Sequence, residues 1–130
     1  MSNNYKPRFG ELWMARLSEI GSVQGGYRPV FIVSNDLNNE HSPTVNIIPL
    51  TSRGNKRNLP VHVYLGKYEE YGLKVPSTML IEQITTINAE SLDRKIGCIS
   101  DPQTLTNIQN AMAIQFPVFL SGDRHDSDVA

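Results

Sequence analysis

The chain has 130 residues, of which 39% are hydrophobic and 8% aromatic, and its formal net charge is −1 at pH 7. This length fits one globular domain, and the nearly neutral charge argues against a nonspecific coat on nucleic acid. No apolar run approaches the roughly 20 residues that span a bilayer. The first residues also lack the apolar core of a signal peptide, so we expect a cytoplasmic protein with no membrane contact. The single cysteine, Cys98, excludes an internal disulfide and is expected to be a small core residue.

The charges are distributed unevenly along the chain. Residues 1–67 contain eight Lys or Arg and four acidic residues, a net charge of +4. Residues 68–130 contain four Lys or Arg and nine acidic residues, a net charge of −5. A surface for nucleic acid is therefore expected in the first half of the chain.

Short apolar and alternating segments predict a mainly β protein. In chain order, the expected strands cover residues 10–17, 27–34, 44–50, 59–65, 77–87 (as two short segments) and 95–99. The polar segment Asn35–Asn39 consists of turn-forming residues and is expected to be a loop. Alternation places Val61, Val63 and Leu65 on one face of their strand, and His62 on the opposite face is expected to be structural.

An amphipathic helix is expected at about residues 101–116. Asp101 is placed to cap it and Pro102 occupies its first position. Apolar residues follow at spacings of three and four: Leu105, Ile108, Met112 and Phe116. Residues 121–130 are acidic and lack apolar anchors, which predicts a disordered tail. Short strands and one closing helix favour a small barrel with an appended helix, formed as one domain over residues 1–120.

Two polar residues at expected strand ends form the candidate site. Arg28 follows the glycine-containing segment 21–26 and opens one strand, and Thr51 ends another. If these strands pair antiparallel, both side chains lie at the same rim of the sheet. A guanidinium fork and a hydroxyl suit metal-free cleavage of a ribose–phosphate chain, in which the 2′-OH attacks and the protein stabilises the phosphorane. From the residues alone, a solvated turn arginine and an ordinary strand-end hydroxyl remain open as alternatives.

Other enzyme classes lack their motifs in this sequence. His41, His62 and His125 are far apart, and none has a Cys or His at ligand spacing, so neither a metal nor another cofactor is expected. The sequence contains no Gly-x-Ser-x-Gly and no phosphate-binding glycine-rich loop leading into a helix.

Seven segments, in their order and spacing, resemble the MazF/PemK-type toxins, which are sequence-specific endoribonucleases of toxin–antitoxin modules. The segments are Gly10–Trp13, Gly21–Val30, Ser34–Asp36, Ser42–Thr44, Pro49–Thr51, Leu59–Val63 and Leu80–Ile84. The resemblance runs from about Arg8 to Leu120 and implies an SH3-like barrel with a C-terminal helix that acts as a homodimer. It implies metal-independent cleavage of single-stranded mRNA at a short sequence, which leaves a 2′,3′-cyclic phosphate and a 5′-OH. It also implies a cognate antitoxin that blocks the RNA groove.

The resemblance places the family's catalytic arginine on Arg28 and its catalytic threonine on Thr51. RNA contacts are expected from a stacking aromatic, from basic residues and from polar side chains: Ser22, Gln24, Tyr27, Arg53, Lys56, Arg57, Ser77 and Gln83. Val23 stands where many relatives have a glutamate, which leaves the general base open. Thr85 stands where many have an arginine, which leaves the recognised sequence open.

The same barrel also serves toxins that inhibit DNA gyrase without catalysis, and this is the alternative function. Those toxins depend on tryptophan and bulky apolar groups at the end of the C-terminal helix. The expected helix here ends with Ala113–Pro117 and contains no tryptophan. A plain SH3-like interaction module is a third interpretation, but it leaves the Arg28 and Thr51 pair unexplained. The sequence therefore favours RNA cleavage.

Overall fold

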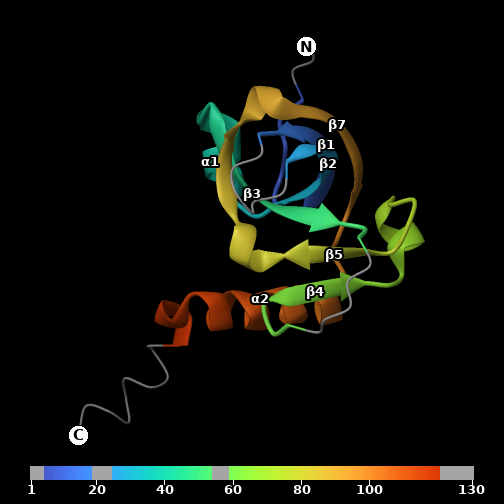
Figure 1. Cartoon of the computed structure of the whole chain (residues 1–130). Coiled ribbons are helices and arrows are strands. Elements are labelled where there is room, and N and C mark those ends of the chain that lie inside the picture. Colours follow the sequence, from blue (N-terminus) through green and yellow to red (C-terminus); the bar gives the residue numbers. More distant parts are fainter. Residues whose placement is uncertain (1–4, 19–24, 54–58, 121–130) are drawn as a thin grey trace, which may run out of the picture.

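The computed structural model describes residues 5–18, 25–53 and 59–120. A sheet of seven antiparallel strands curls over itself, and the longest helix lies along one side of it (Figure 1). The strands are β1 Glu11–Leu17, β2 Gly26–Ile32, β3 Thr44–Thr51, β4 His62–Leu65, β5 Ser77–Leu80, β6 Thr85–Asn88 and β7 Leu92–Cys98. The α-helices are α1 Asp36–His41 and α2 Pro102–Gln115. Short 3₁₀ turns are η1 Tyr68–Tyr71, η2 Ile81–Gln83, η3 Ala89–Ser91 and η4 Pro117–Leu120.

Strand β3 organises the sheet because it pairs with three neighbours. Its first half pairs with β6, its second half with β5, and its middle with β2. The strand order is β4-β5-β3-β2-β1-β7, with β6 branching from β3. Among the described residues the sheet ends at β4 and β7 and does not close on itself, so it forms an open, barrel-like fold. The expected class, mainly β with a C-terminal helix, is confirmed.

The central strands are buried on both faces, which explains the continuous apolar run in β2. Phe31 packs into a core shared with Ile108 of α2, whereas Val30 and Ile32 face a second core around Trp13. Each of these three β2 side chains is fully buried, and burying one such side chain contributes about 1.5–3 kcal/mol. A strand covered on both faces has no polar side to alternate with, so periodicity alone could not orient it.

Helix α2 forms where the capping pattern predicted it. The Asp101 carboxylate accepts a hydrogen bond from the backbone N–H of Thr104 at 3.1 Å, and Pro102 opens the helix. The Tyr71 hydroxyl donates to the same carboxylate at 2.8 Å. Hydrogen bonding from Thr104, and then from Tyr71, outweighs partial burial and lowers the pKa of Asp101. The helix end is thereby fixed to η1 as well as capped.

Two expectations about local structure are wrong. Residues 36–41, most of which were expected to be a loop, form helix α1. The Asn35 side chain caps α1 by accepting from the Asn38 backbone N–H at 2.8 Å, and Asn39 is buried with its amide bonded to the Ser34 carbonyl at 2.9 Å. This helix buries an amide rather than an apolar stripe, so it leaves no hydrophobic period. Cys98, expected in the core, is exposed.

Two strand boundaries also differ. Strand β4 begins at His62, since Leu59 and Pro60 belong to the turn that precedes it. Strand β7 begins at Leu92 instead of Lys95, because pairing with β1 recruits the polar residues Asp93 and Arg94 into the sheet.

Candidate functional site

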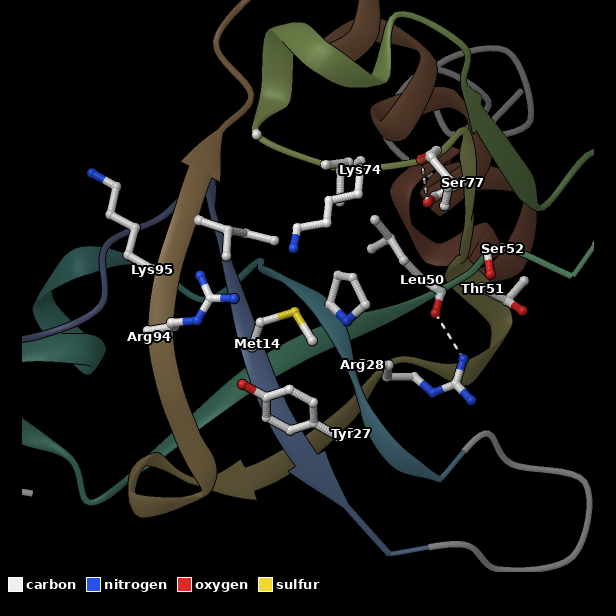
Figure 2. A pocket seen from close by; sticks show the side chains of 15 residues that line it. Met14, Tyr27, Arg28, Leu50, Thr51, Ser52, Lys74, Ser77, Arg94 and Lys95 are labelled. Atoms are coloured by element: carbon white, nitrogen blue, oxygen red, sulfur yellow. Dashed lines mark hydrogen bonds between the residues drawn. The ribbon is translucent and has the colours of Figure 1, made fainter.

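A cavity of about 560 Å³ opens at the rim where β2 begins and β3 ends (Figure 2). Its lining comes from β1, β2, the end of β3 with the residue after it, the start of β5, β7 and the segment between η1 and β5: Met14, Tyr27, Arg28, Pro29, Leu50, Thr51, Ser52, Gly72, Leu73, Lys74, Val75, Ser77, Arg94, Lys95 and Ile96. Its volume lies within the range of about 300–1,000 Å³ typical of ligand sites. The lining combines apolar residues, such as Met14, Pro29 and Leu50, with polar and charged side chains, which is usual for a binding site.

The register of β2 and β3 brings Arg28 and Thr51 to this rim. Val30 lies opposite Pro49, and continuing the same antiparallel register places Arg28 opposite Thr51. The Arg28 Nε donates to the Gly25 carbonyl at 2.8 Å, and Nη1 donates to the Leu50 carbonyl at 3.0 Å (Figure 2). Because Leu50 directly precedes Thr51, the guanidinium is oriented by the strand end that carries the hydroxyl.

Thr51 is buried, and its Oγ1 accepts a hydrogen bond from the backbone N–H of Arg53 at 3.2 Å. A hydroxyl has one donor and two acceptor positions. Since this bond uses an acceptor position, the O–H remains suited to donate to an oxygen in the cavity. Arg28 and Thr51 thus bring a charged donor and a neutral donor to the same cavity, which is a combination suited to an anionic oxygen.

Tyr27 forms a fixed aromatic surface beside Arg28. Its hydroxyl donates to Oδ2 of Asp93 on β7 at 2.5 Å, and this bond is the main cause of the raised pKa of the phenol. The guanidinium carbon of Arg16 lies 5.1 Å from the ring centroid, within the range of a cation–π contact. The ring is still 48% exposed, so it is held in place and remains accessible.

The other predicted RNA-binding residues do not all meet at this cavity. Ser77 lines it, but its hydroxyl donates to the Val75 carbonyl at 3.0 Å and can only accept from a ligand. Arg53 is exposed and next to Thr51, outside the lining. Gln83 lines a different hollow of about 610 Å³ that also contacts β3 and β6. Ser22, Gln24, Lys56 and Arg57 lie outside the described residues.

Sequence reasoning missed the cations that come from the second half of the chain. Lys74, Arg94 and Lys95 all line the cavity, so its positive charge does not come only from residues 1–67, where a surface for nucleic acid was expected. Lys74 follows a 3₁₀ turn and Arg94 sits in an irregular strand, and neither position has a sequence signal. The acidic residues of the second half mask these cations in a sum of charges.

The described parts of the chain contain no group of three or more His, Cys, Asp or Glu side chains that could hold a metal ion. None of the described helices has both the length and the apolar character needed to cross a membrane.

Fold and site together define a small, open β-barrel protein with a cationic rim cavity. Comparison with known proteins gives the family. Residues 8–116 match the family model of the PemK-like, MazF-like toxins of type II toxin–antitoxin systems. Endoribonuclease MazF from Staphylococcus saprophyticus is 41% identical over 108 residues, which cover 82% of this chain and 88% of the relative. The chain therefore belongs to the PemK/MazF toxin family.

Solved structures agree on the fold. MazF from Deinococcus radiodurans superposes with a TM-score of 0.70 at 21% identity, covering 85% of this chain and 96% of that one. The Mycobacterium tuberculosis toxin MazF-mt6 gives a TM-score of 0.68 at 23% identity, covering 82% and 96%. The structure of a mycobacterial endoribonuclease in complex with its cognate antitoxin superposes with a TM-score of 0.65 at 24% identity, and the match covers 85% of this chain and 95% of that one.

Proposed function

We propose that the protein is an endoribonuclease toxin that cleaves single-stranded mRNA at a short sequence without a metal ion. The proposal is supported by the shared location of Arg28 and Thr51: both line one cavity, and Arg28 donates to the carbonyl of Leu50, the residue before Thr51. The 41% identical relative, which is named an endoribonuclease, supports the reaction class. Since mRNA is a cytoplasmic substrate, we expect the protein to act in the cytoplasm.

The chemistry follows from what RNA itself supplies. The ribose 2′-oxygen attacks the adjacent phosphorus, the bond from phosphorus to the 5′-oxygen breaks, and the products are a 2′,3′-cyclic phosphate and a 5′-OH. The 2′-OH loses its proton to a general base and the departing 5′-oxygen gains one. No residue is assigned as the base, because Val23 stands where many relatives have a glutamate.

Arg28 and Thr51 stabilise the charge that develops during this step. Arg28 remains protonated at any physiological pH, so it acts as a donor to the phosphate and not as a base. The Thr51 hydroxyl donates to a nonbridging oxygen. Loss of one such preorganised donor typically lowers the rate about 10²–10³-fold. Tyr27 offers an accessible ring for stacking a base beside the reacting phosphate.

Two partners follow from family membership and are part of the proposal. We infer a cognate antitoxin that blocks the RNA groove, as expected for a member of this family, one of whose structural neighbours was solved in complex with its own antitoxin. We also infer that the protein acts as a homodimer. Both can be measured with the purified toxin, by inhibition with the antitoxin and by light scattering.

The test is incubation of the purified protein with a long single-stranded RNA in EDTA, followed by mapping of the 5′ ends of the products. We expect cuts at one repeated short sequence, and strong loss of cutting in Arg28→Ala and in Thr51→Ala. Lys67→Gln is the matched control, because Lys67 is exposed and does not line the cavity. Full activity in either site variant would contradict the mechanism. No cutting by folded wild-type protein would direct attention to inhibition of DNA gyrase.

A further inference from the structure

The wall of the cavity facing Arg28 and Thr51 carries two more cations. Figure 2 shows Lys74 and Arg94 pointing inward over Met14, from two segments distant in the sequence. Within the described residues, neither side chain forms a salt bridge. Lys95 differs, since its Nζ lies 3.3 Å from the Glu11 carboxylate and its charge is balanced there. Lys74 and Arg94 are therefore the cations of this wall whose charge is left for a ligand.

A β-bulge directs Arg94 toward the cavity. In the pairing of β1 with β7, Met14 lies opposite Arg94 and Ala15 lies opposite Leu92, which leaves Asp93 as an extra residue. A bulge of this kind re-aims side chains and is common beside functional sites. Asp93 holds the Tyr27 hydroxyl, and Arg94 is also close enough to influence the pKa of that phenol. The irregular strand thus places a cation next to the exposed aromatic ring.

Two glycines fix the spacing between the segments that carry the two cations. A Cβ on Gly72 would lie 1.8 Å from the Ile96 carbonyl oxygen, and one on Gly97 would lie 1.9 Å from the Tyr71 carbonyl oxygen. The backbone before Lys74 is therefore in direct contact with the backbone just after Arg94. Such close packing holds the two charges in a defined geometry before any ligand binds, which reduces the entropic cost of binding.

We propose that Lys74 and Arg94 form a second phosphate subsite, which binds the RNA phosphate next to the one held by Arg28 and Thr51. The inference rests on the proposed function. An aromatic ring with cations on both sides matches the alternation of base and phosphate in a single strand, where backbone contacts position the chain and stacking holds a base. This favours RNA over an acidic peptide as the occupant. The subsite positions the substrate and takes no part in the bond changes.

The experiment measures RNA binding as a function of salt. The probe is a short, labelled single-stranded RNA that spans one mapped cleavage site and carries a 2′-deoxyribose at the scissile position, so that it binds without being cut. Binding is followed by fluorescence anisotropy between about 50 and 200 mM salt for the wild type and the double variant Lys74→Gln/Arg94→Gln. Lys67→Gln serves as the surface-charge control. Arg94→Lys tests whether charge alone is sufficient, and thermal melting confirms that every variant is folded.

Removing one phosphate-binding cation from a complex with single-stranded RNA lowers the salt slope by about 0.7. The double variant should therefore have a slope smaller by about 1.4 and bind at least about tenfold more weakly. Lys67→Gln should match the wild type, and Arg94→Lys should retain most of the slope. A double variant with the wild-type slope and affinity would overturn the subsite while leaving the proposed function intact. If the double variant bound RNA like the wild type but was no longer inhibited by the antitoxin, these two cations would be assigned to the contact with the antitoxin instead. A wild type that neither cleaves nor binds RNA would overturn both proposals.

Discussion

Replacing Gly97 by alanine tests the contact that fixes the cavity wall. Gly97 in β7 packs directly on the backbone of Tyr71, where a Cβ would lie 1.9 Å from the carbonyl oxygen and 2.6 Å from the carbonyl carbon. Real Cβ atoms essentially never approach a neighbour closer than 3.0 Å. The two backbones would therefore have to separate by about 1 Å or more. Neither partner is a side chain that can rotate away.

The cost is expected to be large because β7 cannot move freely. Gly97 is paired with Leu12 of β1, which is fully buried, so a shift of β7 disturbs the ladder and the core at once. Overpacking of a rigid site typically costs about 1–3 kcal/mol, and displacement of backbone on both sides places this variant at about 3 kcal/mol or more. For a chain of this size, that loss lowers the melting temperature by roughly 10 °C or more.

The assay is thermal unfolding followed by circular dichroism at one fixed protein concentration, since association would shift the midpoint. Gly66→Ala is the matched control. Its Cβ would lie 2.9 Å from Cε2 of Tyr64, but that ring is 67% exposed and free to turn. The control should change stability by about 0.5 kcal/mol or less. If Gly97→Ala melted within about 2 °C of the control, the argument for a rigid contact between η1 and β7 would be refuted.

Three further predictions concern single side chains. Glu11 is buried, and burial by itself would raise the pKa of its carboxyl group. The carboxylate accepts hydrogen bonds from the Tyr5 hydroxyl, the Trp13 indole and the Arg8 backbone N–H, and it pairs with Lys95. These contacts outweigh the effect of burial, so the pKa of Glu11 is lowered. The stability it supplies is therefore complete above its unfolded-state pKa and is lost as pH falls through the lower folded-state value. Glu11→Gln should lower the free energy of unfolding, measured with urea near neutral pH, by about 2–3 kcal/mol. The variant should also lose less stability than the wild type as the pH is lowered, because the glutamine cannot be protonated. An unchanged acid profile would contradict this. Asp101→Ala removes the helix cap and should lower the free energy of unfolding by about 1–2 kcal/mol, whereas Asp101→Asn can still cap the helix and should lower it less. Equal losses of stability in the two variants, measured by urea unfolding, would refute the capping role. Tyr27→Ala should weaken RNA binding by about 1–3 kcal/mol, measured by anisotropy, whereas Tyr27→Phe keeps the ring and should bind more tightly than the alanine variant.

The sequence alone was sufficient for the class of fold and for the prediction that Arg28 and Thr51 lie at one rim of the sheet. The capping pattern at Asp101 and Pro102 and the spacing of apolar residues after it are local signals, so helix α2 was predictable within a residue or two. Arg28 and Thr51 stood at opposite ends of two strands, and antiparallel pairing of neighbouring strands then brings them together by simple geometry. Helix α1 escaped prediction because its buried group, the Asn39 amide, is polar.

Only the tertiary structure decided the rest of the site. The wall carrying Lys74 and Arg94 depends on the bulge at Asp93 and on the backbone contact between Gly72 and Gly97. These features arise from the packing of segments that lie about 25 residues apart (Gly72 and Gly97) or about 80 residues apart (β1 and β7) in the sequence, and no local pattern in the chain encodes them. Gln83, which was predicted to contact RNA, ends the turn η2 and lines a separate hollow. Local sequence was enough to predict where β2 begins and β3 ends, whereas the side chains that face one another across a cavity are set by how the strands curl and pack.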